Sequence, residues 1–265
     1  MTILGLAVLW GALTAQPGLP PPLDARLEGF VALEPSKRRE LLKDLPREEI
    51  ARALADTPAD RLLRLGREGL SRLGIYRIRL VKEERVGGDL LGPQTIDVTV
   101  RETPFAVRGE VIAGPSRGRR FLYDARSRPD QIRAREAGLL GVVAVWVGID
   151  SSLTRRDTNH RITDLGLGGM LAHLERDDAA AKPFGGERRK DEGFGAAGAY
   201  CLTFEAPPGA TGLYARRARL CIDPADGILR SIDVWDAKGL LERYRFELVG
   251  ARLSPPPDFF SADSF

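Results

Sequence analysis

Histidine and cysteine are scarce in this 265-residue chain, and their scarcity limits the chemistry that the sequence offers. There are only two histidines, His160 and His173, and two cysteines, Cys201 and Cys221. Their spacing matches no zinc-binding pattern, so we expect no metal site and no cofactor. His173 is expected to be a partly exposed residue of a helix.

A strong charge of one sign is also missing, as are long hydrophobic runs. Lys and Arg number 40 against 37 Asp and Glu, which leaves a net charge of +3. Such a balance gives no indication of nucleic-acid binding. Hydrophobic residues make up 43% and charged residues 29% of the chain. These ordinary globular values exclude general disorder, collagen-like proteins and polytopic membrane proteins.

An uncharged apolar stretch lies near the start of the chain, at 3–15. At ~1.5 Å per residue it is too short for a bilayer core of ~30 Å. Its length is typical of a secretory signal peptide, although no basic side chain precedes it, and a buried N-terminal helix is the alternative. We expect a signal peptide at 1–15, a Pro-rich tether at 16–23 and a single domain at 24–265. The expected location is periplasmic or otherwise extracytoplasmic.

Residues 24–73 lack the alternation of strands and are predicted to form a helical front. Ser36 is expected to cap one helix, and Thr57, followed by Pro58, to cap another. The second helix carries leucines along one side, between positions 62 and 73, and arginines largely off that side. We expect the leucines to pack on a sheet, with binding to a membrane surface as the alternative.

From Ile75 onward the apolar residues recur with a period of two, which is typical of strands with one buried face. Helix-sized crossovers between these segments are missing, so an antiparallel sheet is expected over 75–265. The predicted strands fall at 76–80, 96–101, 105–107, 119–124, 131–136, 141–147, 199–205, 213–222, 228–235 and 240–248.

The sequence between the two groups of strands differs in character. Asp164 is expected to cap a helix over 165–176, and residues 177–198 to form an exposed loop rich in Gly, Ala and charge. A glycine cluster at 166–169 could cradle an anion at the start of this helix. The cluster follows no strand and lacks the Lys-Ser/Thr of a phosphate-binding loop, which argues against that use.

The two cysteines allow a sharper prediction. In the hairpin over 199–222, the register that pairs Glu205 with Arg217 also places Cys201 opposite Cys221. Directly opposed residues have Cα separations of ~4.5–5.5 Å, which is within disulfide range. We predict a disulfide that adds on the order of 3 kcal/mol and requires an oxidising compartment. Two unrelated thiols are the alternative.

One motif matches a catalytic pattern by its letters alone. Residues 114–118 read G-P-S-R-G, which fits the G-x-S-x-G signature of serine hydrolases. A nucleophile elbow needs a strand, a sharp turn and then a helix, whereas a predicted strand follows here. We therefore expect a hairpin loop, and a hydrolase that uses Ser116 is a remote alternative.

Five segments together carry a resemblance to a known family. They read KEERVGG (82–88), QTIDVTVRETPF (94–105), FLYD (121–124), NHRIT (159–163) and DAKGLLERYRF (236–246). Over about residues 60–262 the chain resembles an uncharacterised family of exported bacterial proteins. That family is similar to the LolA/LolB-like superfamily of outer-membrane lipoprotein carriers.

The resemblance implies an α+β, LolA-like fold: a curved antiparallel β-sheet (half-barrel) with helices packed on the concave side. In the carriers that space receives acyl chains, and no catalytic residues belong to the family pattern. The implied function is to bind or carry a lipid or lipoprotein acyl chain without catalysis. A further envelope protein is an expected partner, with no nucleic acid and at most peripheral membrane contact.

A half-barrel with apolar residues on its inner face offers a concave surface for a lipid, and each buried methylene contributes ~0.8 kcal/mol. The same residues can equally form a filled core, so a structural or protein-interaction domain of the envelope is the alternative. The candidate ligand-binding residues are Tyr76, Ile78, Val98, Val100, Phe105, Val107, Tyr123, Trp146, Tyr244 and Phe246.

Overall fold

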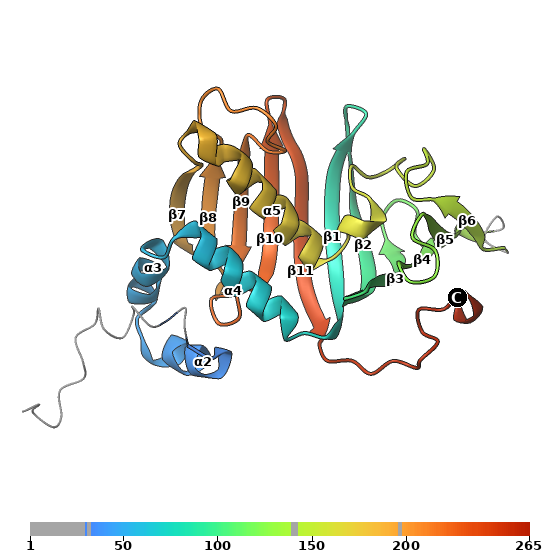
Figure 1. The fold of residues 1–265 in the computed structure, drawn as a ribbon, viewed down its shortest axis with the longest axis horizontal. Coiled ribbons are helices and arrows are strands. Elements are labelled where there is room, and N and C mark those ends of the chain that lie inside the picture. The colour runs from blue at the N-terminus through green and yellow to red at the C-terminus, as the bar shows by residue number, and fades with distance from the viewer. Residues whose placement is uncertain (1–29, 31–32, 139–142, 196–197) are drawn as a thin grey trace, which may run out of the picture.

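The computed structural model describes residues 30, 33–138, 143–195 and 198–265. These residues form one sheet of eleven strands in the order β6-β5-β4-β3-β2-β1-β11-β10-β9-β8-β7 (Figure 1). All neighbouring strands are antiparallel, and the edge strands β6 and β7 do not pair with each other, so the sheet is open. The predicted α+β fold with an antiparallel half-barrel is confirmed.

The strands are β1 (Ile75–Val86), β2 (Asp89–Glu102), β3 (Phe105–Ala113), β4 (Arg120–Asp124), β5 (Gln131–Arg135), β6 (Val145–Gly148), β7 (Arg188–Phe194), β8 (Tyr200–Glu205), β9 (Arg217–Ile222), β10 (Leu229–Asp236) and β11 (Gly239–Gly250). The α-helices are α2 (Pro35–Asp44), α3 (Arg47–Ala55), α4 (Ala59–Ser71) and α5 (Leu167–Ala181).

Helices α4 and α5 cross one face of the sheet (Figure 1). The leucine side of α4 is buried, as predicted, with Leu62 and Leu70 in the main core. Gly69 lets the helix approach the β9–β10 turn, because a Cβ at this position would lie 1.9 Å from the carbonyl oxygen of Asp226. Helix α4 therefore packs across this face of the sheet and against the β9–β10 turn.

The disulfide and its register are confirmed. Cys201 faces Cys221 and Glu205 faces Arg217 in the β8–β9 ladder. The two sulfur atoms are bonded at 2.08 Å. Neighbouring apolar residues such as Leu202 belong to the main core, whereas the cysteines form a separate buried cluster with Ala199. The alternation of β8 thus places the disulfide on the face of the sheet that the helices do not cover.

The prediction that 177–198 is a loop is wrong. Helix α5 continues to Ala181, and β7 pairs with β8 as an edge strand. Charged residues on both sides of β7 hide its strand character in the sequence. An edge strand tolerates such charges, since one of its margins and much of its surface meet water.

Two expected helix caps are also wrong. Helix α2 begins at Pro35 with Glu34 as its N-cap, and α4 begins at Ala59 with Pro58 as its N-cap. The Thr57 hydroxyl instead donates to the carbonyl oxygen of Ala53 at 2.7 Å. Helix α2 has a proline at its first position, where the fixed φ suits the first turn, and α4 begins directly after a proline.

The third expected cap, Asp164, lies in a short 3₁₀ helix, Ile162–Asp164. Helix α5 begins at Leu167, after Gly166 with φ of 110°. The predicted signal peptide at 1–15 and tether at 16–23 lie outside the described residues. No described helix combines the length and the apolar character needed to span a membrane.

Candidate functional site

A cavity of about 430 Å³ lies between the β1–β6 half of the sheet and the chain that connects β6 to α5. We name residues 149–166 of this connection the covering segment. The volume falls in the range of small-molecule sites, ~300–1,000 Å³. Most of the sheet side of the cavity is apolar. Its main apolar residues are Leu80, Ile96, Val111, Phe121, Ile132, Val147 and Phe246.

The covering segment forms the opposite wall. Ile162 and Leu165 line the cavity and pack against the main core. Farther out, Leu153 lines the cavity although 65% of its surface is exposed to solvent.

A buried ion pair marks one end of the cavity. Lys82 and Glu84 follow each other on the inward face of β1, and Lys82 Nζ lies 2.9 Å from Glu84 Oε1. Lys82 Nζ also donates to the carbonyl oxygen of Asp157, and Glu84 accepts from the backbone N–H of Asn159 at 2.6 Å. These bonds attach the covering segment to the sheet and hold it in place over the cavity.

A second carboxylate strengthens this attachment. Glu242, on β11, is 1% exposed and accepts hydrogen bonds from Asn159, the Nε2 of His160 and the hydroxyl of Tyr214. Burial opposes charge on Glu242, but these hydrogen bonds, that from His160 first, lower its pKa below the usual value. Burial likewise opposes protonation of His160, yet the bond and charge of Glu242 outweigh it and raise the pKa of His160.

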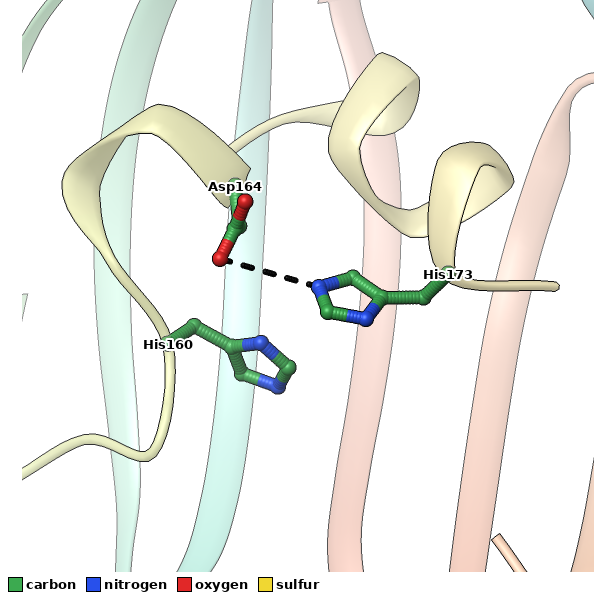
Figure 2. A group of neighbouring side chains, drawn as sticks. All are labelled: His160, Asp164 and His173. Carbon is green, nitrogen blue, oxygen red and sulfur yellow. Dashed lines mark ion pairs between the residues drawn. The ribbon is translucent and has the colours of Figure 1, made fainter. Parts of the chain in front are cut away.

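The two histidines of the chain meet beside this network. Figure 2 shows the imidazoles of His160 and His173 and the carboxylate of Asp164 turned toward one another. One ligand atom from each lies within 4.8 Å of those of the other two. His173 Nε2 is 3.7 Å from Asp164 Oδ2, and this close approach of His173 lowers the pKa of Asp164. The spacing of these residues in the sequence does not predict this cluster, because His160 and Asp164 belong to the covering segment and His173 belongs to α5.

Two of the ten predicted ligand-binding residues, Tyr244 and Phe246, line the cavity. The other eight are absent from its described lining. Five of them are fully buried in the main core: Tyr76, Ile78, Val98, Val100 and Val107.

Of the remaining three, Tyr123 is buried in the main core and Phe105 packs against that core. Phe105 packs against Tyr123, with ring centroids 6.0 Å apart, and the hydroxyl of Tyr123 donates to the carbonyl oxygen of Pro129. Trp146 lies beneath the guanidinium groups of Arg128 and Arg133. All ten stay predictions as contacts of a ligand.

The alternation on β1 contains a sequence signal for the cavity. Tyr76, Ile78, Leu80, Lys82 and Glu84 are every second residue of β1, and all five are buried. Tyr76 lies at the start of α5, where its hydroxyl accepts from the Leu167 N–H, and Ile78 belongs to the main core. The last three line the cavity. Two charged residues that continue an apolar face therefore identify the cavity end of the strand.

The glycine cluster at 166–169 already holds an anionic group of the chain itself. A carboxylate oxygen of Glu102 accepts from the N–H of Gly168 at 3.2 Å, at the start of α5. A Cβ on Gly168 would lie 2.2 Å from the other oxygen of that carboxylate. The position where an external anion would bind is thus taken by Glu102.

The G-P-S-R-G motif lies in the loop between the antiparallel strands β3 and β4. The predicted hairpin loop is confirmed. Ser116 adopts φ of 61°, and the chain continues as a strand. This path differs from the strand–turn–helix of a nucleophile elbow.

Comparison with protein families gives one match. The family described as "Protein of unknown function (DUF1571)" matches residues 74–263. This range contains the whole sheet, the covering segment and α5. No curated protein matches the chain.

Several solved structures are similar to this chain at low identity. Lipoprotein LppX of Mycobacterium tuberculosis is 18% identical, with 75% of this chain and 99% of that chain covered and a TM-score of 0.43. A LolA superfamily protein from Nitrosomonas europaea is 11% identical, with 79% and 100% covered and a TM-score of 0.35. The MucA/MucB complex of Pseudomonas aeruginosa contains a chain that is 16% identical, with 76% and 59% covered and a TM-score of 0.39.

Proposed function

We propose that this chain, which belongs to the DUF1571 family, binds a lipid or the acyl chain of a lipoprotein in the cavity beneath the covering segment. The cavity of about 430 Å³ with apolar walls carries the proposal. Each methylene group that moves from water into such a site contributes ~0.8 kcal/mol. Tyr244 and Phe246 are the predicted contacts that line it.

The charges at the end of the cavity support binding without catalysis. Lys82 pairs with Glu84, and Arg119 pairs with Asp157 at 2.6 Å. The first pair lies within β1, and the second joins the residue before β4 to the covering segment. These charged groups therefore hold the cavity wall in place. A polar end beside apolar walls fits an amphiphile, whose chain takes the apolar part and whose head group stays near the charges.

We place this binding in the cell envelope. The Cys201–Cys221 disulfide supports an oxidising compartment outside the cytoplasm. The uncharged apolar stretch at 3–15 supports export. A carrier in the envelope needs a donor or acceptor for its lipid, so a membrane-associated envelope protein is the proposed second partner.

A titration with a fluorescent fatty acid tests the proposal. Ala134 lines the cavity from β5, and a tryptophan there fills part of the space. We expect wild type to bind the probe saturably at one site and Ala134→Trp to bind it at least ten-fold more weakly. Leu90→Trp is the matched control, because Leu90 is 52% exposed at the start of β2 and is absent from the described cavity lining.

Equal binding by wild type and Ala134→Trp would contradict the proposed site, provided that both variants melt at similar temperatures. If no acyl probe and no extracted lipid binds to wild type, the proposal fails. A protein-interaction domain would then be the better account of the chain.

A further inference from the structure

We propose that His160, Asp164 and His173 form a binding site for a divalent transition-metal ion, and Zn²⁺ is the ion that we select for it. Two imidazoles and one carboxylate are the donor set that zinc accepts in sites with three protein ligands. The three side chains come from two elements that face each other, the covering segment and α5 (Figure 2).

The distances require little movement. Zn–N and Zn–O bonds are about 2.0–2.2 Å long, so two ligands of one ion lie at most about 4 Å apart. His173 Nε2 and Asp164 Oδ2 already meet this limit at 3.7 Å, and all three donors are within 4.8 Å of one another. The largest of these separations exceeds the limit by less than about 1 Å.

The surroundings of His160 match those of a metal ligand. Its Nε2 lies 2.9 Å from Glu242 Oε2, so Nδ1 is the ring nitrogen left to bind an ion. Histidine ligands commonly donate their other ring N–H to a carboxylate, which fixes the tautomer and the orientation of the ring. Glu242 is itself held by Asn159 and Tyr214.

His173 supplies a second, independent indication. Its Nε2 is shielded from solvent and has no hydrogen-bond partner. A buried polar atom without a partner costs free energy, and an ion at this position would remove that cost. The same atom faces Asp164 Oδ2 at 3.7 Å, which is within ion-pair distance and too long for a hydrogen bond.

Arg176 competes with the ion. Its guanidinium lies 2.7 Å from His173 Nδ1, an arrangement in which Nδ1 accepts and Nε2 carries the proton. Coordination through Nε2 requires the proton on Nδ1 instead, so Arg176 must turn away. Arg176 is exposed, so its guanidinium can move into solvent. Removal of this side chain should therefore strengthen metal binding, both through the tautomer and through the loss of a positive charge.

A bound ion would also hold the covering segment against α5. His160 and Asp164 line the main cavity, whereas His173 belongs to α5. The ion would link the two elements and, with three protein ligands, keep a coordination position for water or for an anionic group. This site stands on its own residues and does not depend on the proposed acyl binding.

Calorimetric titration of the full chain with Zn²⁺, after removal of metal by a chelator, tests the site. The chain has no other histidine, and both cysteines are in the disulfide, so competing strong ligands are few. We expect one ion per chain. His173→Asn and Asp164→Asn should each weaken binding by at least about ten-fold, the lower bound seen even for residues that only support a ligand.

Two further variants distinguish the loss of a metal ligand from misfolding of the variant protein. Asp150→Asn removes a carboxylate of the same segment that pairs with Arg161 outside the cluster, and it should leave the affinity unchanged. Arg176→Ala should bind Zn²⁺ more tightly than wild type. Absence of saturable one-to-one binding in both wild type and Arg176→Ala, or equal affinity in His173→Asn and wild type, would overturn the proposal. Binding of the fatty-acid probe is measured separately in metal-free protein, so either result can fail without the other.

Discussion

The two halves of this sheet have similar strands and different covers. Over β9 to β11, helix α5 packs closely, and the space that remains beneath it is about 20 Å³. Over β1 to β6, the covering segment leaves a cavity of about 430 Å³. Both halves present buried aliphatic residues at alternate positions, such as Ile232 on β10 and Ile96 on β2. The cover, and not the composition of the strands, decides whether an apolar face becomes a core or a site.

The covers differ because they are held in different ways. Helix α4 presents a row of leucines and a glycine that permits close approach to the β9–β10 turn. The covering segment has little regular structure and is fixed by charged groups, among them Glu84 and Asp157. The apolar side chains of an amphipathic helix fill the space between the helix and the sheet. A segment that is held only by polar contacts with the sheet leaves the space beneath it empty.

The largest expected effect comes from one truncation made in each half. Ile232→Ala should destabilise the fold by about 2–5 kcal/mol, the usual cost of an Ile-to-Ala cavity in a packed core. Ile96→Ala should cost at least about 1 kcal/mol less, because its side chain already lacks contacts on the cavity side. The two positions are matched, at 4% and 5% exposure. Chemical unfolding measures both, and equal losses would show that the second half is filled as well.

The next effect concerns the disulfide, which lies in the filled half. Cys201→Ala combined with Cys221→Ala should cost about 3 kcal/mol, because the unfolded chain gains the freedom of a loop of 20 residues. Binding of the fatty-acid probe should be unchanged at temperatures where the variant is folded. Reduction of wild type with a thiol is the control and should give the same shift. Loss of probe binding in the folded variant would mean that the two halves are coupled.

The sequence predicts one half of the molecule better than the other, for physical reasons. The register of β8 and β9 follows from residue pairs that are local in the chain, so Cys201 and Cys221 could be placed opposite each other. The cavity depends on contacts between β1 and residues some 75 positions later, such as Glu84 with Asn159. Periodicity along a strand indicates the inward face but not which part of it a helix covers.

The candidate site shows the same limit. Alternation in the sequence predicts Tyr244 and Phe246 as contacts, and they line the cavity together with Leu80 and Lys82, which lie at alternate positions of β1. The meeting of His160 and His173 follows from the way the covering segment returns to α5, which no spacing encodes. The edge strand β7 was missed because its charges are typical of a loop.

A smaller effect is expected from pH at the outer edge of the filled half. Burial, with the charges of Asp177 and Asp178, raises the pKa of Glu187 to about 7 from an ordinary value of 4.5. Between these two pH values the unfolded chain releases this proton and the folded chain keeps it, so stability falls as pH rises from about 4.5 to about 7. Glu187→Gln should be more stable than wild type at pH 8 and nearly equal to it at pH 4.

Thermal melts across this range measure the effect. Glu48→Gln, at an exposed position of α3, serves as the control and should follow the wild-type profile. A Glu187→Gln profile that is parallel to that of wild type from pH 4 to pH 8 would contradict the assignment.

The smallest effect is expected at the tip of the β3–β4 hairpin, in the half with the cavity. Ser116 adopts φ of 61°, a conformation that costs residues other than glycine roughly 1 kcal/mol. Ser116→Gly should therefore raise the free energy of unfolding by no more than about 1 kcal/mol, since glycine also adds freedom to the unfolded chain. Probe binding should not change. Detection of an ester hydrolysis that disappears in this variant would favour the hydrolase alternative instead.

The most direct test of the account is the mass of the native protein after purification without detergent. Native mass spectrometry of wild type should show a population heavier by one lipid-sized molecule, which organic extraction removes and identifies. The same population should be depleted in Ala134→Trp and retained in Leu90→Trp. A wild-type protein that carries no extractable lipid and takes up none from vesicles would contradict the claim that the cavity over β1 to β6 binds a lipid.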